Sequence, residues 1–118
     1  MTPRGTTYDN WVWHKTGPDA RSAVQKEFDN LPVDARAKLW QRMEKFRMGT
    51  NAPRDIDDLG HGLMEIRVKI GSNPYRVIFF CDGRTPVALT AIKKKDQRLP
   101  EQDRSRAHDR MKSWLDWH

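Results

Sequence analysis

Charged side chains in two consecutive stretches of the chain recur with the spacing of strands. In residues 63–70, Glu65, Arg67 and Lys69 occupy every second position, and the next apolar stretch carries Arg76. Because successive side chains of a strand point to opposite faces, the first three share one face. Guanidinium and ammonium groups bind phosphate oxygens, and a carboxylate among them can move a proton or orient a cation. The pattern therefore points to a site for a polyanion.

Pairing between these two stretches is expected to bring cations together. If residues 71–74 (GSNP) form the connecting loop, Lys69 faces Arg76 and Arg67 faces Ile78. Directly opposed like charges destabilise a sheet, so an anion between Lys69 and Arg76 would explain the pair. This prediction depends on the loop length, because a one-residue shift turns the side chains to the other face.

Three lysines, Lys93, Lys94 and Lys95, end a third apolar stretch at residues 86–95. They form either a solvated strand end or part of the same basic face. The loop at residues 82–84 decides between them: one loop length turns Lys94 to the charged face, and the other turns Lys93 and Lys95 to it.

The charge of the whole chain agrees with a polyanionic partner. Its 118 residues hold 22 Lys and Arg against 16 Asp and Glu, a formal net charge of +6. Residues 1–66 carry ten basic and ten acidic side chains, whereas residues 67–112 carry twelve and five. The excess lies in one contiguous block, which indicates either a nucleic-acid site or a solvated basic surface.

Several classes of protein are excluded or disfavoured. The single Cys81 rules out an intramolecular disulfide and a Cys-rich zinc site. No apolar run approaches the roughly 20 residues that span a bilayer, and the N-terminus has no apolar signal region. We therefore expect a cytoplasmic protein.

Apolar spacing predicts the elements that position the charged residues. We expect a polar flexible arm at residues 1–7 and a single domain at 8–118. The predicted elements are a short strand at 8–14, helices at 19–30 and from 33 to about 48, a loop at 50–62, strands at 63–70, 75–81 and 86–95, and a helix after Pro100. This order, β-α-α-β-β-β-α, predicts an α+β fold with a small antiparallel sheet and helices packed on one face.

Three motifs in these strands are shared with one family of small proteins. They are Gly62-Leu63-Met64-Glu65-Ile66-Arg67, Tyr75-Arg76-Val77, and Ile92-Lys93-Lys94-Lys95 followed by Pro100. Together they resemble the RelE/ParE superfamily of toxins, most closely its HigB-like branch of phage-derived toxin proteins. The resemblance covers about residues 8–112 and implies a RelE-like fold.

The resemblance implies the toxin of a type II toxin–antitoxin system that cuts mRNA on the ribosome. In such endoribonucleases the 2′-OH of the RNA attacks the adjacent phosphate, giving a 2′,3′-cyclic phosphate and a free 5′-OH. No metal or other cofactor is required. The implied partners are the ribosome, mRNA and a helix-turn-helix, HigA-like antitoxin, and no membrane is involved.

The resemblance also implies roles for individual residues. Arg76 would hold the scissile phosphate, Arg67 would share its charge, and Lys94 or Lys95 would stabilise charge or act as general acid. Glu65 would be either the general base or, as we prefer, a group that orients Arg67 or Lys69. Contacts to RNA and the ribosome are expected from a wider basic set: Lys69, Lys93, Arg98, Arg104, Arg106 and Arg110.

The group that moves the protons is left unassigned. RelE-type relatives use a tyrosine in or before the last helix, whereas the only tyrosines here are Tyr8 and Tyr75. His61 is expected to be a plain loop residue and His108 a surface residue of the last helix. Two other functions stay open: a ParE-like toxin that inhibits DNA gyrase, and a catalytically silent phage or prophage protein that binds nucleic acid or a partner.

Overall fold

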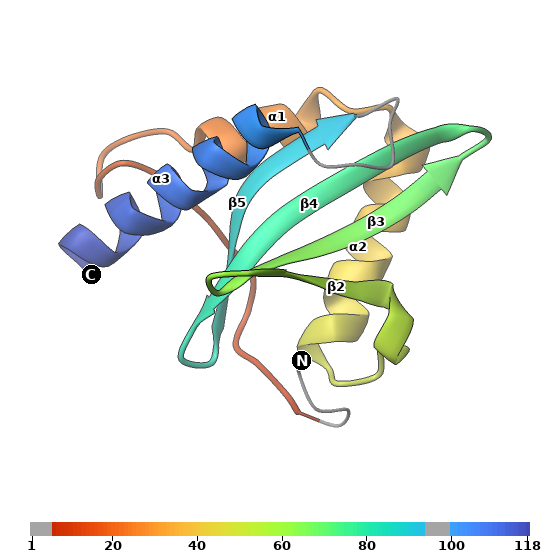
Figure 1. Cartoon of the computed structure of the whole chain (residues 1–118), viewed down its shortest axis with the longest axis horizontal. Coiled ribbons are helices and arrows are strands. Elements are labelled where there is room, and N and C mark those ends of the chain that lie inside the picture. The colour runs from red at the N-terminus through yellow and green to blue at the C-terminus, as the bar shows by residue number, and fades with distance from the viewer. Residues whose placement is uncertain (1–5, 94–99) are drawn as a thin grey trace.

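In the part of the chain that the structure describes, a twisted five-stranded sheet packs against three α-helices (Figure 1). The computed structural model describes residues 6–93 and 100–118. Within them the elements are β1 (Val12–Trp13), α1 (Ala23–Asp29), α2 (Val33–Arg47), the 3₁₀ turn η1 (Pro53–Asp55), β2 (Ile56–Gly60), β3 (Leu63–Ile70), β4 (Asn73–Asp82), β5 (Thr85–Lys93) and α3 (Glu101–Trp117). The strand order is β1-β5-β4-β3-β2; β1 runs parallel to β5 and the other neighbours are antiparallel.

The helices divide between the two faces of the sheet. The predicted α+β class is confirmed, but α3 packs on the face opposite α1 and α2, which corrects the expectation of helices on one face only. The reason is that β4 is apolar on both sides. Val77 and Phe79 point into the core under α1 and α2, whereas Ile78 and Phe80 point to the other face and are buried there by α3.

Residues 50–62, expected to be a loop, contain the edge strand β2. Ile56 lies opposite Ile66 and Asp57 lies opposite Glu65 in the ladder with β3. The connection between β2 and β3 is the two-residue turn His61–Gly62, and both residues have positive φ, 54° and 85°. A tight hairpin of this kind follows the twist of its strands and places His61 at the tip.

The core under α2 follows the predicted apolar stripe. Ala35, Leu39, Met43 and Phe46 are all buried, and α2 ends before Gly49, whose φ of 73° suits glycine. Trp11 joins this core and donates its indole N–H to the carbonyl of Met43 at 2.7 Å. The shared core fixes α2 against β3 and β4, so these two strands have a rigid backing.

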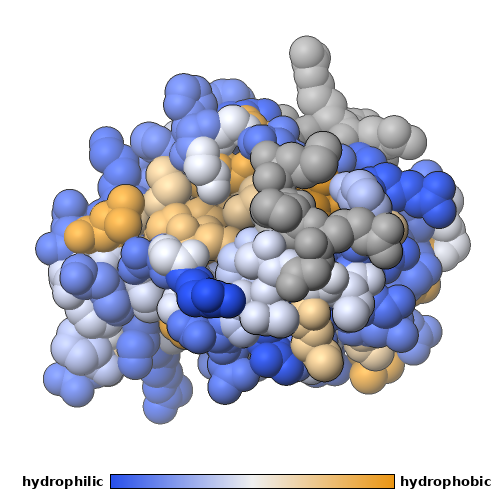
Figure 2. All heavy atoms as spheres, turned by 90° about the horizontal axis from the view of Figure 1, so that it is seen from below, coloured by the Kyte–Doolittle hydropathy of each residue, from blue (hydrophilic) through white to orange (hydrophobic). Residues whose placement is uncertain are grey.

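The surface is largely hydrophilic, as the composition requires. Seen from below, charged and polar side chains dominate and hydrophobic ones gather in a smaller patch (Figure 2). None of the helices in the described ranges has both the length and the apolar character to span a bilayer. Of the predicted N-terminal arm, residues 1–5 lie outside the described residues, and the carbonyl of Thr7 accepts a hydrogen bond from Arg84 at 2.9 Å.

Candidate active site

The sheet face that carries α3 also carries the charged row of β3. β3 and β4 are joined by a two-residue turn, Gly71–Ser72, rather than by the four-residue loop expected from sequence. The register therefore shifts by two residues, so that Arg67, and not Lys69, lies directly opposite Arg76. A shift of two keeps every side chain on its predicted face. Two cationic residues thus face each other on neighbouring strands, as the sequence suggested, but the partner of Arg76 is Arg67 rather than Lys69.

Arg76 and Glu65 form a buried ion pair beneath this face. Arg76 is 1% exposed and Glu65 is 2% exposed, and Nη1 of Arg76 lies 3.4 Å from Oε2 of Glu65. Burial raises the pKa of Glu65, while the positive charges of Arg76 and Arg67 oppose that rise. The carboxylate that sequence reasoning assigned to Arg67 or Lys69 is therefore hydrogen-bonded to Arg76.

Arg67 is the guanidinium of this pair of strands that reaches the surface. Its side chain is 37% exposed and makes an ion pair of 3.6 Å with Asp57 of β2. An exposed pair at this distance is weak, so the guanidinium can exchange its partner for a phosphate at little cost. Lys69, two residues further along the same face, is also exposed. Arg67 and Lys69 are thus the cations of β3 that are accessible at the surface.

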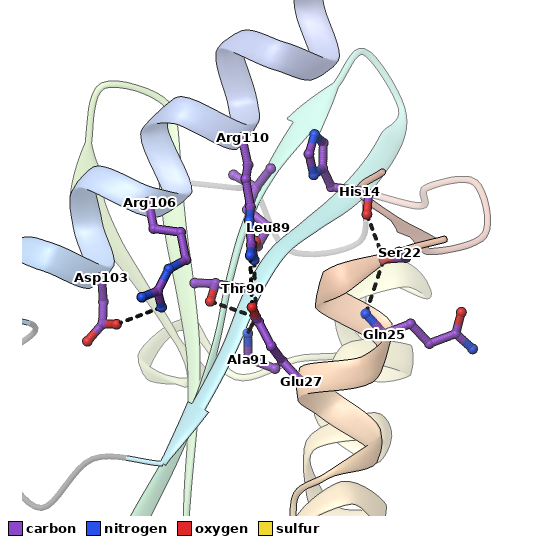
Figure 3. Close-up of polar contacts among 10 residues, drawn as sticks. All are labelled: His14, Ser22, Gln25, Glu27, Leu89, Thr90, Ala91, Asp103, Arg106 and Arg110. Carbon is purple, nitrogen blue, oxygen red and sulfur yellow. Dashed lines mark hydrogen bonds and ion pairs between the residues drawn. The ribbon is translucent and has the colours of Figure 1, made fainter. Parts of the chain in front are cut away.

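Three arginines of α3 have intramolecular partners. Arg104 donates to the carbonyl of Leu59 at 2.7 Å, and Arg106 pairs with Asp103 at 3.1 Å. Arg110 pairs with Glu27 of α1 at 2.9 Å (Figure 3). The predicted contacts of these three arginines to RNA stay predictions. In the structure Arg104 and Arg110 link α3 to β2 and α1, and Arg106 makes its ion pair within α3.

The lysines at the end of β5 divide between the sheet face and the undescribed segment. Ile92 lies opposite Arg76, whereas Lys93 lies opposite Tyr75, and its ammonium is 5.9 Å from the centre of that ring. Tyr75 belongs to the core under α1 and α2, so Lys93 points away from the charged row. Lys94, Lys95 and Arg98 lie outside the described residues.

An open pocket of about 850 Å³ lies on the α3 side of the sheet, between the β2–β3 turn and the first turns of α3. His61 and His108 both line it, with ring centres 6.4 Å apart and ring planes at 79°. Arg104 and Leu63 also line it, and Leu63 precedes Glu65 by two residues on the same face of β3. The rest of the lining comes from α3 and the residue before it: Pro100, Glu101 and Ser105.

Sequence reasoning did not bring these two histidines together. His108 was expected at the surface, and His61 was expected in a plain loop. One signal was present: Glu101, Arg104, Ser105 and His108 recur at the spacing of a single helix face. The other half of the pocket depends on α3 crossing the turn at His61, and that crossing follows only from the tertiary structure.

Within residues 6–93 and 100–118, no three His, Cys, Asp or Glu side chains converge in a way that could hold a metal ion. What the described residues do offer on the α3 side of the sheet includes cations, the buried carboxylate of Glu65 and the imidazoles of His61 and His108. Such groups can bind a phosphate and transfer protons.

Comparisons with known proteins find a family model, named relatives and a solved structure that resemble this chain. A family model described as phage-derived protein Gp49-like (DUF891) matches residues 26–112. Proteins named probable endoribonuclease HigB1, from two strains of Mycobacterium tuberculosis, are 36% identical to this chain over 112 residues, which are 95% of this chain and 90% of the relative. The free-state structure of an arginine double mutant of the E. coli toxin RelE has a TM-score of 0.63 and 13% identity, and covers 89% of this chain and 98% of that chain. At that identity the likeness concerns the fold alone.

Proposed function

Because the family model covers most of its length, the chain belongs to the Gp49-like family of phage-derived proteins, and we propose that it is an endoribonuclease toxin of a type II toxin–antitoxin pair. The resemblance to HigB-like toxins inferred from three strand motifs is confirmed by this membership and by the HigB1 relatives. The fold agrees as well, since RelE shares it.

One observation carries the proposal: the 36% identity to a probable endoribonuclease extends over 95% of this chain and 90% of the relative. The similarity therefore spans the sheet, the helices and the charged face together. A shared motif within an unrelated domain would not produce such coverage.

The reaction we propose is the attack of an RNA 2′-OH on its own phosphate, which yields a 2′,3′-cyclic phosphate and a free 5′-OH without a metal. Arg67 is the exposed guanidinium of the charged row and suits a phosphate oxygen. The Glu65–Arg76 ion pair lies beneath Arg67, and the pair stabilises β3 and β4 under the charged row. Lys94 and Lys95, outside the described residues, are proposed to add positive charge along the RNA backbone that Arg67 binds.

The proposed substrate is mRNA on the translating ribosome, in the cytoplasm. The net charge of +7 in residues 67–112 suits a polyanionic surface such as ribosomal RNA. The partner that restrains the toxin is proposed to be a cognate helix-turn-helix antitoxin that covers the basic face.

The test is to express the chain in bacteria and to map mRNA 5′ ends on translating ribosomes. Arg67→Ala is the informative variant, because loss of an exposed ion pair leaves the fold intact. The matched control is Arg54→Ala, which removes an exposed arginine from η1, a turn tied to α2 through Arg42 and Asp55.

We expect codon-phased cuts with the wild type and Arg54→Ala, and a strong loss of cuts with Arg67→Ala. Growth arrest with intact mRNA would contradict the proposal and favour gyrase inhibition. Absence of any effect on growth would favour a catalytically silent protein.

A further inference from the structure

The pocket beside α3 is lined by two histidines, His61 and His108, to which the proposed function assigns no role. The chain has four histidines, and two of them, His61 from the β2–β3 turn and His108 from α3, line this one pocket. They are 47 residues apart in the sequence, and their ring centres are 6.4 Å apart. Among residues 6–93 and 100–118, the contact found for either ring is this edge-to-face approach, and His61 is exposed while His108 is partly exposed, so a ligand can reach both rings.

Imidazole is the side chain best suited to proton transfer near neutral pH. An unperturbed imidazole titrates at about pH 6.5, so one ring of a pair can accept a proton while the other donates one. Ring centres 6.4 Å apart leave room for one phosphodiester within hydrogen-bond reach of both rings, since such bonds are about 2.8 Å long. The two rings therefore have the chemistry and the spacing that cleavage by an internal 2′-OH requires.

Arg104 supplies a fixed positive charge in the same pocket. Its Nη1 donates to the carbonyl of Leu59 at 2.7 Å, which anchors the guanidinium between β2 and α3. A guanidinium has five N–H donors, so this single bond leaves others for a phosphate oxygen. Among the described residues of the lining, the acidic one is Glu101, which is exposed and lies in the first turn of α3, where the helix dipole favours a carboxylate.

The pocket also adjoins the charged row of β3. Leu63 forms part of its lining, and Glu65 and Arg67 follow on the same face of the strand at steps of about 7 Å. An RNA strand whose scissile phosphate sits between the histidines can therefore place a neighbouring phosphate near Arg67.

We propose that His61 and His108 are the general base and general acid of RNA cleavage, and that Arg104 holds the scissile phosphate between them. This inference rests on the proposed endoribonuclease activity. One imidazole takes the proton of the 2′-OH while the oxygen forms its bond to phosphorus. The P–O5′ bond breaks with its electron pair on the 5′ oxygen, and the other imidazole, entering as imidazolium, gives that oxygen a proton. No water, metal or redox partner enters the step.

The test measures single-turnover cleavage of mRNA on programmed ribosomes by His61→Gln and His108→Gln. The control is His118→Gln, at the end of α3 ten residues beyond His108, or about 15 Å along the helix. Thermal melting of each variant verifies that it folds. We expect a loss of about 100-fold or more for each pocket histidine, the size usual for general acid–base catalysis, and little change in the control. We also expect each pocket variant to lose a different limb of the pH–rate profile.

Two results separate the inference from the proposed function. If the wild type cuts and the double variant His61→Gln/His108→Gln cuts within threefold of it, the pair is not catalytic and the endoribonuclease proposal stands. If the wild type makes no cut, the endoribonuclease proposal fails, and the inference fails with it.

A binding measurement adds a readout that needs no ribosome. With uridine 3′-monophosphate as the probe, NMR should show the Hε1 signals of His61 and His108 moving together, while the signal of His118 stays in place. Arg104→Gln should weaken this response at least tenfold. Unmoved histidine signals at millimolar nucleotide would overturn the assignment of the pocket as a phosphate site.

Discussion

Replacement of Arg76 by alanine should unfold the protein far more readily than replacement of Arg67, although the two guanidinium groups face each other across β3 and β4. Arg76 is 1% exposed and pairs with the buried Glu65, so Arg76→Ala leaves a carboxylate in a site where burial already raises its pKa. Breaking one partner of a buried pair costs about 3–5 kcal/mol, against about 5–15 kcal/mol for the whole stability of a domain. The exposed pair of Arg67 with Asp57 contributes about 0–1 kcal/mol.

The assay is urea unfolding followed by tryptophan fluorescence, since Trp11 and Trp114 are buried in the two cores. With a slope of about 1–3 kcal/mol per molar urea, Arg76→Ala should lower the midpoint by about 2 M, and Arg67→Ala by less than about 0.5 M. The reasoning is refuted if the two variants lose equal stability.

The same variant has a pH signature with a definite sign. The pKa of Glu65 is raised in the folded protein, so at a pH between the unfolded and the folded pKa the folded state holds a proton that the unfolded chain releases. Stability therefore rises as the pH falls through the folded pKa toward 4.5, the ordinary pKa of a glutamate carboxyl. Without Arg76 the carboxyl loses its nearest positive charge, so the deficit of Arg76→Ala should shrink between pH 7 and pH 5.

Three further perturbations test other parts of the structure. Burial raises the pKa of Cys81 to about 11, so the native thiol should react with iodoacetamide at pH 8 roughly a hundredfold more slowly than in urea-unfolded protein. Burial, together with the charge of Arg110, lowers the pKa of His14, so stability is lost as the pH drops from about 7 through the folded pKa; His14→Gln should reduce the difference in Tm between pH 7 and pH 5. Glu27→Ala removes an ion pair with Arg110 and should cost about 1–3 kcal/mol in urea unfolding.

The alternation of β3 was enough to place its charged row on one face, because strand periodicity survives any even shift of register. Its exact partners were not predictable, since a two-residue turn at Gly71–Ser72 and a four-residue loop give the same alternation. Likewise the bulge in β5, where Ile78 pairs with Thr90 but Phe79 pairs with Ala88, determines which face Lys93 takes, and no local pattern signals it.

The edge strand β2 and the sheet face on which α3 packs were not predicted, for a different reason. The segment at Ile56–Gly60 is rich in aspartate and glycine, and it becomes a strand because β3 offers it an unpaired edge. For α3, β4 is apolar at successive positions, which indicated a central strand. The sequence did not show which helix covers which face. The pocket between His61 and His108 requires both the β2–β3 hairpin and the packing of α3 on this face, so the sequence alone did not predict it.

The carboxylate of Glu27 has a consequence for how this protein meets other chains. Within residues 6–93 and 100–118, β1 pairs with β5 at Val87 and Ala88, so the part of β5 beyond Ala88 is an edge of the sheet. There Glu27 accepts the backbone N–H of Ala91 at 3.2 Å and the hydroxyl of Thr90 at 2.9 Å (Figure 3). An incoming strand would have to displace that carboxylate from Arg110 as well as from the backbone. Glu27 thus blocks the pairing of another strand with this edge of the sheet. A partner that adds a strand to the sheet is therefore expected to pair with β2.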